Sequence, residues 1–175
     1  MSASAEARID GVDERTVFLR HVVYTALGAV AALTSTAIWW LMIDDEGRSA
    51  GAASVEMLVK FTNLTVLSVA VVAAWIAFGP PGGMARRLAH VTVLMLVVVT
   101  ADVNVVLLDP GLPPGWWGVV DLFQHYLVPI AVVTSWATIG PYVDIPPSRL
   151  GWTLVVPLAW LVFVIVRGVS TDRSP

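Results

Sequence analysis

The chain has 175 residues, of which 57% are hydrophobic and only 13% charged, and its formal net charge is −3. An ordinary soluble domain carries roughly 25% charged residues, so this composition excludes a conventional water-coated globule. The absence of cysteine excludes disulfides, thiol catalysis and cysteine-ligated metals. No nucleic-acid motif or basic run occurs, so nucleic acid is not an expected partner. The length predicts a single domain, and the composition places it in a membrane.

Five apolar stretches are long enough to span the hydrocarbon core, which takes about 20 residues of helix. They are Leu19–Met42, Val55–Phe78, Arg87–Leu108, Gly118–Gly140 and Leu150–Val166. Charged or Gly/Pro-rich turns separate them, so consecutive spans are expected to be antiparallel neighbours. Polar tails, residues 1–18 and 168–175, flank the apolar region, and the first stretch is too long for a signal-peptide core. The prediction is an all-α polytopic transmembrane helix bundle of about five spans.

Basic residues in short loops set the orientation of such a protein. An N-terminus in the cytoplasm puts six of the ten basic residues inside, and five spans then place the C-terminus outside. The inner set is Arg8, Arg15, Arg20, Arg86, Arg87 and Arg149; the outer set is Arg48, Lys60, Arg167 and Arg173. The sequence therefore predicts a multi-pass protein of the cell membrane with a cytoplasmic N-terminus. Abundant Ala and Val, with arginine as nearly all the basic residues, indicates a GC-rich bacterial genome.

Polar residues inside membrane spans are costly and usually face the bundle interior. In the orientation above they gather in the outer half of the bundle, while the inner half is expected to be nearly all apolar. With a rise of 1.5 Å per residue, Thr62 and His125 both fall about 10 Å from the outer ends of their spans. His90 is expected at the inner interface. The outer-half set is Thr62, Asn63, Asp102, Asp121, His125 and Arg167.

The spacing of these residues indicates which of them share a helix face. Asp121 and His125 are four residues apart, so the carboxylate can orient the imidazole as a general base requires. Thr62 and Thr65 also share a face. Each residue has a structural alternative as well: a threonine can bond back to its own helix, and a single histidine can join two helices. Arg167 can simply extend to the headgroups.

Several chemistries have no support in the sequence. There is no Gly-rich phosphate loop, no Gly-x-Ser-x-Gly turn and no His-Glu-x-x-His helix. A zinc site is not expected, because only one histidine belongs to the polar cluster. His90 and His125 lie near opposite faces of the membrane, which argues against a haem held by both. No cofactor and no metal are therefore predicted.

Three segments together resemble a known family. They are Lys60–Thr65, Asp121–Pro129, and Val156–Trp160 followed by Arg167 and Gly168. Their order and spacing resemble the bacterial Pr6Pr-type membrane proteins, which are similar to the eukaryotic androgen-induced-gene and androgen-dependent TFPI-regulating protein family. The resemblance covers roughly residues 55–168. Members of that family have six spans, so the chain is expected to be a bundle of that type lacking the last span.

The resemblance implies an activity and two residues for it. The eukaryotic members are transmembrane threonine hydrolases that cleave fatty-acid esters of hydroxy fatty acids, using a threonine in an early span and a histidine in a later one. The matching positions are Thr62 and His125. A threonine hydroxyl needs a base within hydrogen-bond reach to attack an ester. Supporting roles are expected among Asp121, Asn63, Thr65, Asp102 and Arg167, with Asn63, Thr65 and Arg167 as candidate donors to an oxyanion.

Three functions stay open at this point. The specific hypothesis is an intramembrane hydrolase of lipid esters that uses Thr62 and His125. The alternative is a non-catalytic bundle that binds membrane lipid or a partner protein. A small transporter is disfavoured, because the chain has no internal repeat and no pair of broken helices. The sequence predicts membrane lipids as partners and leaves the oligomeric state open.

Overall fold

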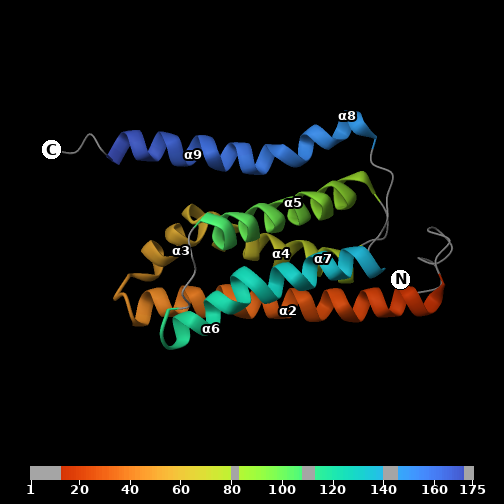
Figure 1. The fold of residues 1–175 in the computed structure, drawn as a ribbon, viewed down its shortest axis with the longest axis horizontal. Helices are drawn as coiled ribbons and strands as arrows, with labels where there is room; N and C mark the ends of the chain where they lie inside the picture. Colours follow the sequence, from red (N-terminus) through yellow and green to blue (C-terminus); the bar gives the residue numbers. More distant parts are fainter. Residues whose placement is uncertain (1–12, 80–82, 108–112, 140–145, 172–175) are drawn as a thin grey trace.

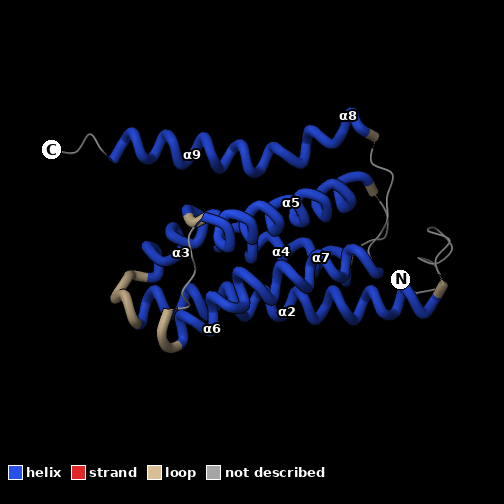
Figure 2. The backbone as a smooth tube through the Cα atoms, viewed as in Figure 1, coloured by secondary structure: helices blue, strands red, loops and turns tan. Residues whose placement is uncertain are grey.

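A computed structural model describes residues 13–79, 83–107, 113–139 and 146–171. Within these residues the protein is an all-α bundle without strands (Figure 1). Figure 2 shows the long helices lying roughly along one common axis. In chain order the helices are α2 (Glu14–Asp44), α3 (Ala50–Val59), α4 (Phe61–Phe78), α5 (Met84–Leu107), α6 (Trp116–Leu122), the π-helical turn η1 (Phe123–Leu127), α7 (Val128–Ile139), α8 (Pro147–Leu150), the 3₁₀ turn η2 (Gly151–Leu154) and α9 (Val155–Thr171).

Four helical segments in the described part of the chain are long and apolar enough to cross a membrane. They are Glu14–Asp44, Phe61–Phe78, Trp116–Ile139 and Pro147–Arg167. The 24 residues of α5 extend about 36 Å at 1.5 Å per residue, which also exceeds the hydrocarbon thickness. The expected all-α bundle of about five spans is confirmed, as is a protein suited to cross the membrane several times.

The first helix, α2, is the longest, and it packs against α4 over much of its length. Its start is capped by Asp13, whose carboxylate accepts hydrogen bonds from the Thr16 N–H at 2.8 Å and the Thr16 hydroxyl at 3.0 Å. Small residues such as Gly28 and Ala31 let the two backbones approach closely. A continuous apolar core between α2, α4, α5 and α7 follows from this contact.

The predicted span 55–78 is divided between two helices. Lys60 has an extended conformation, with φ −76° and ψ 119°, so α3 ends at Val59 and α4 begins at Phe61. Glu56 and Lys60 are the charged residues of this stretch, and their side chains lie 3.6 Å apart at the end of the bundle. Because charged groups are poorly solvated in hydrocarbon, the chain turns where it can keep them together near the membrane surface. The hydropathy pattern predicted one continuous span here, because a single charged turn hardly changes the mean hydropathy of the stretch.

Proline shapes both of the remaining long segments. Pro129 has no N–H, so the α-helical bond to the carbonyl of residue 125 cannot form. The helix widens into η1, where the Val128 N–H donates to the Phe123 carbonyl five residues earlier. Similarly, Pro157 cannot bond to the carbonyl of Thr153, and the chain preceding α9 forms the 3₁₀ turn η2.

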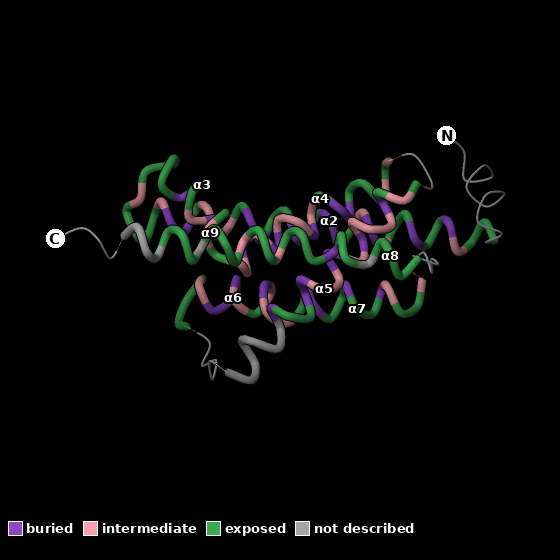
Figure 3. The backbone as a smooth tube through the Cα atoms, turned by 90° about the horizontal axis from the view of Figure 1, so that it is seen from above, coloured by how far each residue is buried: buried purple, intermediate pink, exposed green. Residues whose placement is uncertain are grey.

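The last helix, α9, lies along the outside of the bundle. Figure 1 shows it apart from α2, and Figure 3 shows it mostly exposed. Its large apolar side chains, such as Leu158, Val162 and Ile165, are more than half exposed. Contact with the bundle comes through η2, where the Thr153 hydroxyl donates to the Met95 sulfur at 3.2 Å, and through Trp160. An exposed surface of this composition suits contact with lipid chains.

Candidate functional site

One cavity brings together most of the residues singled out by the sequence. Its volume is about 410 Å³, and it opens near the ends of α2, α4 and α6. The polar part of its wall comes from the start of α4 and from the α6–η1 segment, and the apolar part from α2, α6 and α9. The lining residues are Ile38, Met42, Lys60, Phe61, Thr62, Asn63, Pro113, Trp117, Val120, Asp121, Gln124, His125 and Trp160.

Asp121 and His125 form the charged pair that their spacing predicted. The Nε2 atom of His125 lies 3.3 Å from Oδ1 of Asp121, and both side chains are largely buried. Such a carboxylate favours a proton on Nε2, which leaves Nδ1 as the basic nitrogen. That Nδ1 atom is buried and has no hydrogen-bond partner among the described residues. The pair therefore has the arrangement of an oriented imidazole base with one nitrogen unused.

Thr62 lies on the same cavity wall as this pair. Because α4 begins at Phe61, Thr62 belongs to the first turn of α4 and not to a helix running from Val55. Thr62 therefore lies at the start of its helix, and not about 10 Å along a longer helix as its place in the predicted span indicated. Its side chain is partly buried, and within the described residues no hydrogen bond joins its hydroxyl to His125. The structure thus brings nucleophile and base candidates to one cavity without direct contact.

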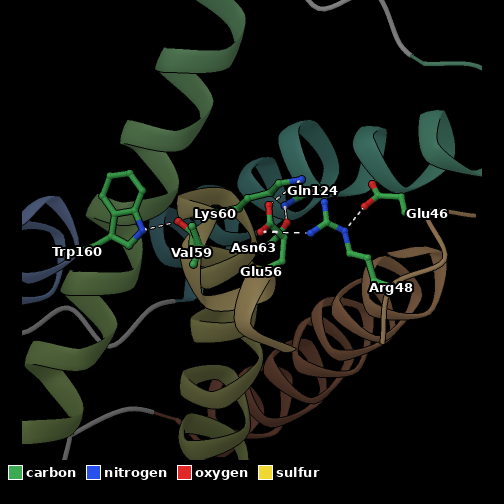
Figure 4. A network of polar contacts seen from close by, with 8 residues as sticks. All are labelled: Glu46, Arg48, Glu56, Val59, Lys60, Asn63, Gln124 and Trp160. Atoms are coloured by element: carbon green, nitrogen blue, oxygen red, sulfur yellow. Dashed lines mark hydrogen bonds and ion pairs between the residues drawn. The ribbon is translucent and has the colours of Figure 1, made fainter. Parts of the chain in front are cut away.

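Asn63 and Gln124 form a second polar pair in the cavity wall. The Nε2 group of Gln124 donates to Oδ1 of Asn63 at 2.6 Å, joining α4 to η1 (Figure 4). Both side chains are buried, at 3% and 7% exposure. The Nδ2 group of Asn63 has no partner among the described residues. Leaving a buried donor unsatisfied costs roughly 1–3 kcal/mol, so this amide marks a place where a ligand group is needed.

Charged side chains gather beside the cavity at the α3–α4 junction. Figure 4 shows Arg48 between Glu46 and Glu56, with Lys60 next to Glu56. Glu56 lies 3.7 Å from Arg48 and 3.6 Å from Lys60. Hydrogen bonding to Glu46 raises the pKa of Arg48 above its usual range. This network holds the junction at a polar surface and places Lys60 at the edge of the cavity.

Trp160 closes the cavity on the side of α9. Its Nε1–H donates to the Val59 carbonyl at 2.9 Å (Figure 4). Its ring centroid lies 4.7 Å from that of Phe61. The Val59 carbonyl is at the end of α3, where a helix leaves its last carbonyls without intrahelical partners. Trp160 therefore supplies a hydrogen-bond donor to the last carbonyl of α3 and also forms part of the cavity wall.

The other predicted site residues lie elsewhere. The hydroxyl of Thr65 pairs with that of Thr100 at 3.1 Å between α4 and α5, and Thr65 does not line the cavity. Arg167 is exposed near the end of α9 and does not line it either. Asp102 belongs to α5, but its side chain lies outside the part of the chain that the structure describes. The predicted supporting set thus reduces, among described side chains, to Asp121 and Asn63.

Buried polar residues also lie in the half of the bundle that contains the start of α2, which was expected to be nearly all apolar. Arg20, Arg86 and His90 are all less than 10% exposed. The Tyr24 hydroxyl and Nε2 of His90 lie within hydrogen-bond distance, at 3.0 Å, and Nε of Arg20 donates to the Ile139 carbonyl at 3.1 Å. These bonds join α2 to α5 and α7, which is an interhelical role. Gln124 and Trp160 also line the cavity, although neither was among the predicted site residues.

No group of three or more histidine, aspartate or glutamate side chains suited to a metal occurs among the described residues. Comparison with protein-family models finds none that matches this chain, and no curated protein or solved structure is significantly similar to it. The candidate site therefore has to be judged on its own geometry.

Proposed function

We propose that this membrane protein hydrolyses lipid esters within the cavity, with Thr62 as nucleophile and His125 as base. The observation that carries the proposal is the shared cavity. A hydroxyl, an imidazole with an unused nitrogen and the carboxylate facing its other nitrogen line one space inside an apolar bundle. The resemblance to the Pr6Pr-type proteins and their eukaryotic relatives implies the same nucleophile and base, Thr62 and His125.

The chemistry follows from the roles of these groups. His125 accepts the proton of the Thr62 hydroxyl as its oxygen attacks the ester carbonyl. The tetrahedral intermediate then expels the alcohol, which takes the proton back from His125. Water, activated by the same histidine, hydrolyses the acyl-threonine and regenerates the hydroxyl. Asp121 orients the imidazole and stabilises its charged form throughout.

The lining of the cavity fits an acyl substrate. Ile38, Met42 and Val120 offer an apolar wall, while Thr62 and His125 form the polar one. An amphiphile with an acyl chain and an ester group matches both walls. Trp160 of α9 lines the same cavity, and the other large apolar side chains that the structure describes in α9 are exposed, so such a substrate can arrive from the bilayer along this helix.

The test is turnover of fluorogenic acyl esters by the protein purified into lipid nanodiscs. We expect Thr62→Ala and His125→Ala each to lower kcat by about 10³-fold or more, because nucleophile and base act as a unit. Ser68→Ala is the matched control, since Ser68 lies on the same helix and bonds back to the Leu64 carbonyl at 2.8 Å. Turnover no higher than the protein-free background in both wild type and Thr62→Ala, with lipid retained in the cavity, would identify a non-catalytic lipid-binding bundle instead.

A further inference from the structure

The catalytic roles above leave one requirement of ester hydrolysis unassigned. When Thr62 attacks, the carbonyl oxygen of the ester gains negative charge and needs hydrogen-bond donors at a fixed position. Such donors work best when they are buried and already oriented, because no reorganisation is then needed during the reaction. The residue that supplies the donor has to lie beside Thr62 and line the cavity.

Asn63 meets these conditions among the side chains that the structure describes. It follows Thr62 in the first turn of α4, lines the cavity and is 97% buried, since its exposed fraction is 3%. Its Nδ2 group has no partner in the described part of the chain.

Gln124 decides which way this amide points. Its Nε2 group donates to Oδ1 of Asn63 at 2.6 Å, so the oxygen is occupied and the N–H₂ group faces away from Gln124 (Figure 4). Gln124 itself is held in η1, the widened turn that Pro129 imposes, and it directly precedes His125. One short π-helical turn therefore positions both the base and the residue that orients Asn63, and such turns are frequent at functional sites.

The start of α4 adds donors of the same kind. The Leu64 N–H donates to the Lys60 carbonyl at 3.0 Å, and the backbone N–H groups that precede it belong to the first turn, where a helix has no carbonyls of its own to bond. The positive end of the helix macrodipole lies there too, and it favours negative charge. The Asn63 amide and the backbone N–H groups at the start of α4 can therefore stabilise a negative charge that develops beside Thr62.

We propose that Asn63 donates a hydrogen bond to the carbonyl oxygen of the ester in the transition state, and that Gln124 is a positioning residue that fixes the Asn63 amide for this task. The inference rests on the proposed function and deepens it, because it specifies that the bound group is an acyl carbonyl held at the start of α4.

The experiment measures kcat and KM separately for variants of both residues in nanodiscs. Asn63→Ala removes the donor, and we expect kcat to fall about 10²–10³-fold while KM stays within about threefold. Gln124→Glu replaces the donor by an acceptor, so the Asn63 amide turns its N–H₂ group toward the new carboxylate and kcat falls similarly. Gln124→Leu leaves the amide free to rotate and should cost about tenfold.

Two further measurements separate the proposal from a loss of packing. Ser135→Ala removes another buried polar side chain, which bonds to the Val132 carbonyl at 3.0 Å, and should leave kcat unchanged. The rate of phosphonate labelling should fall in Asn63→Ala in step with kcat, because the phosphonate adduct mimics the charged intermediate. Asn63→Asp keeps an acceptor for Gln124 and serves if the alanine variant does not fold.

The outcomes distinguish this inference from the proposed function. Wild-type turnover that is lost in Thr62→Ala but unchanged in Asn63→Ala would overturn the role of Asn63 alone. A rise in KM with kcat unchanged would assign Asn63 to ground-state binding and also overturn it. A wild type that turns over no acyl ester overturns both proposals together.

Discussion

The packing of α2 on α4 predicts opposite effects for two substitutions of Gly28. A Cβ atom at this position would lie 3.4 Å from Cβ of Ala73, 3.4 Å from N of Ala74 and 3.6 Å from O of Ala70. These are ordinary contact distances, so alanine fits without displacing α4. Glycine within a helix costs about 0.5–1 kcal/mol relative to alanine, and Gly28→Ala should stabilise the protein by up to that amount.

Gly28→Leu adds three carbon atoms beyond a Cβ already in contact with the α4 backbone. Overpacking of this kind costs typically about 1–3 kcal/mol. Unfolding in detergent micelles, followed by circular dichroism, should therefore place alanine at or above wild type and leucine clearly below it. A leucine variant as stable as the alanine variant would refute the close approach of α2 and α4 at this crossing.

Three other predictions follow from the site and the orientation. Asp121→Asn removes the carboxylate facing His125 and should lower kcat about 10²-fold with normal thermal stability; an unchanged kcat would remove Asp121 from the mechanism. Trp160→Ala removes both the hydrogen bond to the Val59 carbonyl and the ring contact with Phe61, whereas Trp160→Phe keeps an aromatic ring. The distribution of spin-label distances between α9 and α4 should therefore broaden more in the alanine variant. Equal distributions in the two variants would contradict the contact. Because the chain has no cysteine, Asp45→Cys and Ser148→Cys give clean reporters, and an impermeant maleimide should label only the first in intact cells if the N-terminus is cytoplasmic.

The helical fold could be predicted because apolar length determines it. Each predicted span is largely helical. A stretch of about 20 apolar residues in hydrocarbon has no water to bond its backbone N–H and C=O groups, so these groups have to bond to one another within a helix. The break at Lys60 could not be predicted, because a single extended residue leaves the average hydropathy unchanged. Pro129 did signal an interrupted helix, but whether it would kink, break or widen depends on packing against neighbouring helices.

The candidate site was predictable only where residues share a helix. Asp121 and His125 are four residues apart, so their contact follows from the helical period alone. The pairing of Asn63 with Gln124 depends on the rotation of α4 against η1, which no spacing reveals. For the same reason Thr65 was expected beside Thr62, whereas the structure directs it to Thr100. The buried Arg20 and His90 show that long or aromatic polar side chains can reach partners across helices from positions that seemed interfacial by sequence.

The most direct test of the central claim is labelling with a fluorophosphonate probe, which reacts with an activated hydroxyl. Membranes with wild type, Thr62→Ala and His125→Ala at matched levels would be labelled, and the modified peptide identified by mass spectrometry. The account predicts an adduct on Thr62 in the wild type and no labelling in either variant. Labelling that persists in Thr62→Ala, or a wild type that is folded, inserted and unlabelled, would contradict an activated threonine in this cavity.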